Sequence, residues 1–211
     1  MPDSELIPSP FVNSSMLSFR ILGPLKVVVA GRPLDIGGPR ACAVLGVLLA
    51  NAPRPVSIDD LIDAVWDDDP PDTAKRQIQN CVSALRRAFA DAGAPGPVII
   101  GTGPSHHIRP EPGALDAEEF AAGVAAAADL CRAGQERSAA DRLAAVLALW
   151  RGPALLGLSG RTVQAVAAKL DEHRLAAAEQ RYELELGLGR HGEVVAELAD
   201  LVASHPLRER L

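Results

Sequence analysis

One stretch of the sequence combines side chains that can read bases with charges that can bind phosphates. Residues 73–90 contain four Lys or Arg residues and no Asp or Glu. At 100° per residue, Arg76, Asn80, Ser83 and Arg87 share one helix face. The opposite stripe is apolar and consists of Ala74, Ile78, Cys81, Val82, Leu85 and Phe89. Because Arg, Asn, Gln and Ser can hydrogen-bond base edges and cations attract phosphates, the stretch predicts a helix that contacts DNA.

The segments before this stretch predict a small sheet and two further helices. Residues 17–36 contain short apolar runs broken by Gly-Pro and by Ala-Gly-Arg-Pro, which favours three small antiparallel strands. Pro39 suits the first position of a helix that continues through the apolar residues 41–49. Ser57 is a suitable N-cap for a second helix, which has two aspartates in its first turn.

The segment after the stretch, residues 98–109, predicts two short strands around a glycine turn. Strands, three helices and a hairpin are typical of a winged helix-turn-helix, whose third helix enters the major groove while the hairpin reaches the adjacent backbone. His106 and His107 point to opposite faces of a strand, which favours a phosphate contact by one of them over a shared metal ion. The residues expected to contact DNA are Thr73, Lys75, Arg76, Gln79, Asn80, Ser83, Arg86, Arg87, His106, His107 and Arg109.

The second half of the sequence predicts helices only. Asp116 and Glu119 have the spacing of a capping box at the start of one helix. Further helices are expected near residues 139–150, 162–188 and 194–202. Their succession and their many alanines favour a tetratricopeptide-like helical repeat. We therefore expect a mainly α protein with a small β component, in which a winged helix-turn-helix is followed by a tetratricopeptide-like helical domain.

The composition divides the chain into three segments. Residues 1–16 contain prolines among polar residues without a sustained period, which predicts a disordered tail. Residues 17–112 form the expected winged-helix domain and residues 113–211 the helical domain. Because the sequence stops just as a new helix begins, we expect the natural protein to be longer.

The net charge of −6 is unevenly distributed along the chain. Residues 17–112 contain ten Lys or Arg and ten Asp or Glu, whereas residues 113–211 contain eleven and fifteen. Asp3 and Glu5 supply the remaining two negative charges. The acidity therefore belongs mainly to the second half, and DNA binding by the first half stays compatible with an acidic chain.

Several other classes of protein find little support in the sequence. No apolar run reaches the roughly 18 residues of a membrane span, and no secretory signal begins the chain, so a cytoplasmic protein without membrane contact is expected. The three cysteines are an odd number and lie far apart, which favours buried thiols over disulfides. Residues 101–103 read Gly-Thr-Gly but lack the Lys-Ser/Thr ending of a phosphate loop. We expect no enzymatic activity, no metal and no cofactor.

Short motifs in both halves resemble one known family. In the first half they are FRILGPL (19–25), VSIDDLIDAVW (56–66) and VSALRR (82–87). In the second half they are ALWRGPAL (148–155), LGRH (188–191) and HPLRERL (205–211). In order and spacing the chain resembles the Streptomyces antibiotic regulatory protein (SARP) family, in which an OmpR-type winged helix precedes a bacterial transcriptional activation domain.

The resemblance implies a transcriptional activator of antibiotic and other secondary-metabolite genes. Such an activator binds direct repeats in double-stranded promoter DNA as a dimer, recruits RNA polymerase holoenzyme and acts at the nucleoid. Asp67, Asp68 and Asp69 precede the cationic helix and could offer negative charge to the sigma factor, or could simply form a solvated loop that breaks the helix. The alternative function is a protein–protein adaptor that uses the helical repeat, with the winged helix as a packing module.

Overall fold

The first sheet forms at the beginning of the described chain. The computed structural model describes residues 16–190 and 192. Strands β1 (Leu17–Arg20), β2 (Lys26–Val29) and β3 (Arg32–Pro33) pair antiparallel in the order β1-β2-β3. This confirms the three small strands predicted from the sequence. The predicted tail, apart from Met16, and the predicted helix near residues 194–202 lie outside the described residues.

Three helices follow, and their starts are the ones the sequence predicts. They are α1 (Pro39–Asn51), α2 (Ile58–Trp66) and α3 (Ala74–Asp91). Gly38 is the N-cap of α1, with proline at the first helical position. At the start of α2, the Asp60 amide donates to Ser57 Oγ at 3.0 Å, and the Ser57 amide donates to Asp60 Oδ2 at 3.2 Å. This reciprocal capping box fixes the direction in which α2 leaves the sheet.

The wing is a sheet of three strands rather than the predicted two. Strands β5 (Ile99–Thr102) and β6 (Ser105–Ile108) form the expected hairpin, and β4 (Val56–Ser57) pairs with the other side of β6. The order is β4-β6-β5, so β6 is the central strand. Sequence reasoning missed β4 because two residues beside a helix N-cap are too few to show a period.

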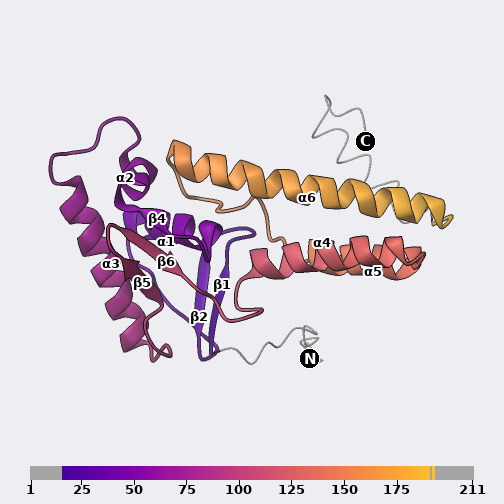
Figure 1. Ribbon diagram of the computed structural model, residues 1–211, viewed down its shortest axis with the longest axis horizontal. Coiled ribbons are helices and arrows are strands. Elements are labelled where there is room, and N and C mark those ends of the chain that lie inside the picture. Colours follow the sequence, from indigo (N-terminus) through magenta and orange to yellow (C-terminus); the bar gives the residue numbers. More distant parts are fainter. Residues whose placement is uncertain (1–15, 191, 193–211) are drawn as a thin grey trace, which may run out of the picture.

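The second half of the described chain is helical. It consists of α4 (Asp116–Arg132), α5 (Glu136–Leu147) and α6 (Arg161–Gly187). Helix α4 packs on α5, and α6 runs along α5 and begins beside α2 (Figure 1). A winged helix followed by a helical domain, mainly α with small sheets, is the fold class that the sequence predicts. None of the described helices is long and apolar enough to cross a membrane.

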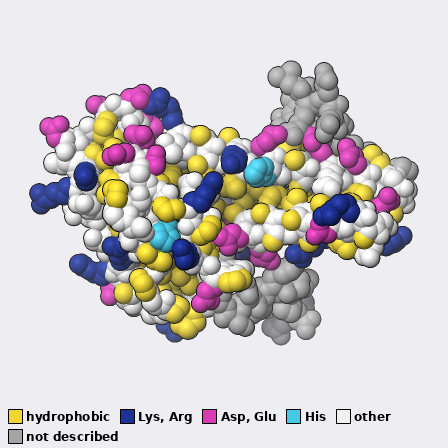
Figure 2. All heavy atoms as spheres, in the orientation of Figure 1, with side chains coloured by type: hydrophobic (Ala, Val, Ile, Leu, Met, Phe, Trp, Pro, Cys, Tyr) yellow, Lys and Arg dark blue, Asp and Glu magenta, His cyan; other side chains and the backbone are white. Residues whose placement is uncertain are grey.

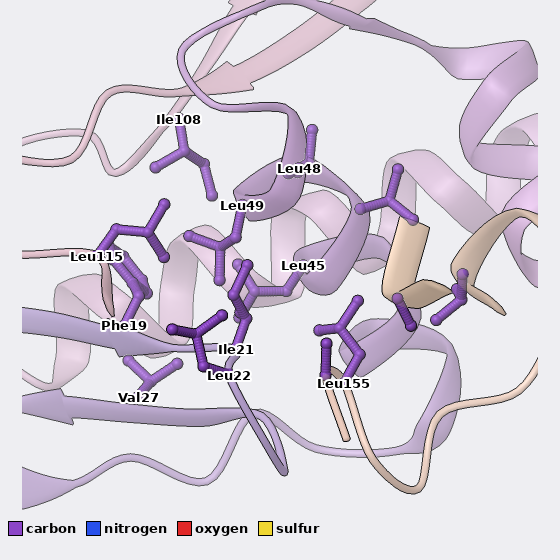
Figure 3. Close-up of a cluster of buried hydrophobic side chains, with 14 of the residues drawn as sticks. Phe19, Ile21, Leu22, Val27, Leu45, Leu48, Leu49, Ile108, Leu115 and Leu155 are labelled. Atoms are coloured by element: carbon purple, nitrogen blue, oxygen red, sulfur yellow. The ribbon is translucent and has the colours of Figure 1, made fainter. Parts of the chain in front are cut away.

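One hydrophobic core joins the two halves of the chain. Leu155 of the second half belongs to the same buried cluster as Leu22 and Leu45 (Figure 3), and its methyl groups lie against Gly46 of α1. Backbone hydrogen bonds reinforce this contact, because the Leu155 amide donates to the Ile21 carbonyl at 3.0 Å and the Arg151 amide donates to the Leu22 carbonyl at 2.8 Å. The segment between α5 and α6 is therefore built onto the loop that follows β1.

Asp116 makes a second link between the halves, and the predicted capping box at α4 is wrong. Asp116 is the first residue of α4, its side chain does not cap the helix, and the N-cap is Leu115. Instead, Asp116 Oδ1 accepts from the Ile21 amide at 2.8 Å and Oδ2 accepts from the Leu22 amide at 3.2 Å. Burial raises the pKa of Asp116, and these two hydrogen bonds act in the opposite direction. The carboxylate is thus committed to the loop after β1.

The three cysteines are free and half-buried, whereas the sequence led us to expect buried thiols. Cys42 lies in α1, and its thiol donates weakly to the Gly37 carbonyl at 3.6 Å. Cys81 lies in α3, at the border between the buried stripe and the exposed face, which is why part of its side chain reaches solvent.

Candidate nucleic-acid interface

Helix α3 lies at one edge of the molecule (Figure 1), and its polar face is exposed. Its buried side chains are Ala74, Ile78, Val82, Leu85 and Phe89, which confirms the predicted apolar stripe apart from the half-buried Cys81. The face opposite this stripe is exposed at Lys75, Arg76, Gln79, Asn80, Ser83 and Arg87. Thr73, the N-cap residue, is exposed as well. Folding therefore brings seven of the predicted contact residues onto one continuous surface.

Arg86 differs from the other cations of α3 because it is half-buried against the wing. Its Nε donates to the Ile99 carbonyl of β5 at 3.0 Å. Its Nη2 packs closely against Gly101 of β5, since a Cβ atom at position 101 would lie only 3.2 Å from it. The structure thus places Arg86 between α3 and the hairpin, where it holds the wing on the helix.

The two histidines of the wing do not lie on the exposed surface. His106 is 9% exposed and His107 is 6% exposed. The sequence analysis expected one of them to contact phosphate, and this placement does not fit that expectation. The reason is packing between distant segments, since α1 contacts β6 and Arg86 lies near His106, while the missed strand β4 pairs with the outer edge of β6. Arg109, directly after β6, is exposed.

The imidazole of His106 is buried. Neither of its ring nitrogens has a hydrogen-bond partner within the described residues. Burial lowers the pKa of His106, and the nearby positive charge of Arg86 lowers it further. The neutral form is therefore favoured. His107 differs, because its Nδ1 lies 3.5 Å from the Thr102 hydroxyl of the neighbouring strand.

Arg40 is an exposed cation beside α3 that sequence reasoning missed. Its guanidinium lies over the Trp66 ring, 5.3 Å from the ring centre, and its Nη1 donates to Gln77 Oε1 at 2.9 Å. The side-chain Nε2 of Gln77 in turn donates to the Thr73 hydroxyl at 2.9 Å. Arg40 is far from α3 in sequence, so only folding shows that it extends the basic surface of α3 onto α1.

The acidic turn, residues 67–73, connects α2 to α3. Asp67 is half-buried, whereas Asp68 and Asp69 are exposed. Asp67 and Asp68 form ion pairs with Arg161 of α6, and Asp69 makes no ion pair within the described part of the chain. Figure 2 shows acidic side chains gathered over α2 and this turn, with basic side chains along the neighbouring edge formed by α3. Positive and negative surfaces therefore adjoin at the start of α3.

This arrangement defines a winged-helix protein in which the polar face of the third helix is exposed among the described residues, and in which a helical domain follows the winged helix. Comparisons with known families agree with the geometry. Residues 34–104 match the family described as transcriptional regulatory protein, C terminal, and residues 115–211 match the bacterial transcriptional activator domain. The first match includes the elements from α1 to β5, and the second includes α4, α5 and α6. The chain belongs to the SARP family of transcriptional regulators, with an OmpR-type winged helix and a bacterial transcriptional activator domain.

Individual relatives match over nearly the whole of this chain. The chain is 36% identical over 197 residues to transcriptional regulatory protein EmbR of Mycobacterium tuberculosis, which covers 92% of this chain and 51% of EmbR. It is 37% identical over 201 residues to regulatory protein AfsR of Streptomyces coelicolor, covering 94% of this chain and 20% of AfsR. Transcriptional regulator RedD of the same species is 30% identical over 207 residues, covering 96% of this chain and 59% of RedD.

A solved structure is similar over nearly the whole described fold. It is Mycobacterium tuberculosis EmbR in complex with a low affinity phosphopeptide, with a TM-score of 0.86 and 35% sequence identity. The superposition covers 93% of this chain and 52% of that chain. The chain thus spans about half the length of EmbR, which places the winged helix and the helical domain within the shared part.

Proposed function

We propose that this chain binds promoter DNA through the outer face of α3 and activates transcription of secondary-metabolite genes. The observation that carries the proposal is the division of α3 into a buried apolar stripe and an exposed polar face. Arg, Asn, Gln and Ser, the side chains that can hydrogen-bond base edges, occur together on the exposed face of α3, which supports DNA as the partner of this face. Similarity to AfsR and RedD, which are regulators of Streptomyces coelicolor, supports the choice of genes.

The proposed contacts follow from the placement of each side chain. Arg76, Gln79, Asn80 and Ser83 would face base edges in the major groove, because they lie on the middle of the free face. Exposed cations at its margins, Arg87 and the newly found Arg40 among them, would contact phosphates. Arg86 would support the wing rather than read DNA.

Activation would combine paired binding with recruitment of RNA polymerase. Two protomers would bind direct repeats head to tail, about one helical turn apart. The acidic turn leads into α3 and would offer its exposed carboxylates to a basic surface of the sigma factor. Of these, Asp69 is the most available, since Arg161 already pairs with Asp67 and Asp68. The protein would act in the cytoplasm, at the nucleoid.

The experiment that tests this function is selection of DNA by the purified 211-residue chain from a random-sequence duplex library. We expect enrichment of a direct repeat, and a footprint on the same repeat in promoters next to the gene. The matched control is Arg137→Ala, which removes an exposed cation from α5, far from α3 in the chain. Recovery of no common sequence, with binding that depends only on salt, would contradict the proposal.

The alternative, a protein–protein adaptor, is favoured by one feature of the helical domain. An apolar groove of about 490 Å³ runs between the end of α1, α4 and α6, and hydrophobic side chains are visible there in Figure 2. It is lined mainly by alanine and leucine side chains, with Glu118, His173 and Gln180 among them. An adaptor would bind its partner through this groove and would leave DNA unselected, so the same selection experiment separates the two functions.

A further inference from the structure

Helix α6 has no capping side chain of its own. Its N-cap is Gly160, which has no side chain to accept a hydrogen bond from the first turn. The first amides of a helix need acceptors, because no earlier turn supplies carbonyls for them. Here the acceptor comes from the winged helix: the Arg161 amide donates to Asp67 Oδ1 at 2.7 Å. A residue of the acidic turn therefore caps a helix of the activator domain.

The same junction is packed too closely for a side chain at position 160. Gly160 has a φ of +103°, and a Cβ built there would lie 2.7 Å from the Ala64 carbonyl oxygen of α2. Real Cβ atoms do not approach a carbonyl oxygen so closely. The end of α2 and the start of α6 thus touch backbone to backbone, and only glycine permits both the conformation and the contact.

Asp67 lies where the backbone changes direction at the end of α2. It follows the last residue of α2 and has a φ of +53°, which is unusual for a residue other than glycine. Its conformation sets the direction in which the chain leaves α2 toward α3. Arg161 adds an ion pair to Asp68, and its Nε lies 3.8 Å from Asp67 Oδ1. The first two residues of the turn are therefore held by α6.

We propose that the start of α6 positions the recognition helix: Asp67, Gly160 and Arg161 fix the turn between α2 and α3, and so the pose of α3 on DNA, without touching DNA themselves. This inference rests on the proposed function of α3. The start of α6 in the activator domain would then be connected directly to the turn of the helix-turn-helix. A displacement of α6 would shift the start of α3, and DNA bound to α3 would in turn restrain the movement of α6.

The first test compares two substitutions at one position. Asp67→Asn and Asp67→Gly both remove one negative charge, and both residues tolerate a positive φ. Only Asn keeps an oxygen that can accept from the Arg161 amide. We expect Asp67→Gly to bind the selected duplex about fivefold more weakly than wild type, the effect of a lost helix cap, while Asp67→Asn binds at least as tightly as wild type.

The second test changes no charge. Gly160→Ala places a methyl group against the Ala64 carbonyl, whereas Gly157→Ala is the matched control, since Gly157 also has a positive φ, +91°, but has nothing within 4 Å of its Cβ position. We expect weaker binding of the selected duplex by Gly160→Ala only. Hydrogen exchange in residues 67–73 should accelerate in Gly160→Ala and Asp67→Gly, and not in the two controls.

The salt dependence separates positioning from contact. If Arg161 touched phosphate, Arg161→Gln would reduce the salt slope by about one, whereas a positioning role leaves the slope unchanged and lowers the preference for selected over scrambled duplex. Wild-type affinity in both Asp67→Gly and Gly160→Ala, even with lowered melting temperatures, would overturn the inference. Failure of the wild-type chain to prefer any duplex would instead overturn the proposed function, and unchanged hydrogen exchange in the turn would then overturn the positioning role separately.

Discussion

At the scale of single residues, Arg76 and Arg87 carry the most direct prediction. Both are exposed on the free face of α3, and the fold does not need either side chain for its core. We expect replacement of either by alanine to weaken binding of the selected duplex by about 1–3 kcal/mol if it reads a base. A phosphate contact would instead lower the salt slope by about one. Equilibrium titrations at several salt concentrations distinguish the two roles.

The control for this prediction is thermal unfolding. Because both side chains are exposed, neither substitution should shift the melting temperature by more than a surface change does. Unchanged affinity of both variants at moderate salt would show that DNA does not approach this face of α3.

His106 gives a prediction about pH. Burial, followed by the charge of Arg86, holds the pKa of His106 below its ordinary value of 6.5, so the unfolded chain binds this proton more readily than the folded chain. Its contribution to stability is therefore present above pH 6.5 and is lost as the pH falls through the lowered pKa. We expect urea unfolding of His106→Phe to depend less on pH below 6.5 than unfolding of the wild type. Parallel pH profiles for the two proteins would contradict this assignment.

At the scale of elements, the wing and α3 act as one unit. Arg86 connects α3 to β5, and β4 connects the start of α2 to β6. The hairpin is thereby fixed both to the helix-turn-helix and to its recognition helix. In this unit α1 contacts β6, and the two histidines that look available in the sequence are buried.

The acidic turn supplies the prediction that belongs to this scale. Changing Asp67, Asp68 and Asp69 together to Asn removes three charges and keeps an oxygen at position 67 that can cap α6. We expect DNA binding to be retained or slightly tightened, because three charges that repel phosphate are lost. Transcription should fall if the turn recruits polymerase.

Promoter binding and transcription must therefore be measured separately on the same template. Asp69→Asn alone tests the carboxylate that is not paired with Arg161. Transcription that changes only in proportion to DNA binding would remove the turn from the mechanism and leave activation to the helical domain.

At the scale of the whole molecule, the two halves are one packed body. Asp116, Leu155 and the start of α6 each contact the winged helix, by a buried carboxylate, a shared core and a backbone contact respectively. Two protomers on adjacent repeats would therefore present their helical domains in a fixed relation to the DNA. A flexible linker between the halves would not impose such a relation.

This rigidity sharpens the prediction about promoter geometry. We expect two protomers to bind cooperatively when the repeats lie about one helical turn apart, on one face of the duplex. Insertion of half a turn between the repeats moves the second protomer to the opposite face, and cooperativity should be lost while binding to each single repeat remains. Gel shifts on the two templates test this, and cooperativity that survives the insertion would count against head-to-tail contacts.

Local patterns in the sequence determined much of the fold and of the candidate site. The 3.6-residue period of residues 73–90 predicts both the buried stripe and the free face of α3, since a helix places every third or fourth side chain on one side. The Ser57 cap and Pro39 start are equally local, because each depends on residues within one helical turn. Such features need no knowledge of distant partners.

Only the tertiary structure decided which polar groups are used between elements. The sequence assigns Asp116 to its own helix, yet its carboxylate binds the Ile21 and Leu22 amides 95 and 94 residues away. Likewise β4, the burial of His106 and the place of Arg40 beside Gln77 all depend on pairings between distant segments. The cap of α6 by Asp67 is the same kind of contact. A period reports which face of one element is apolar, but a hydrogen bond between two elements exists only once the core has set their distance and angle.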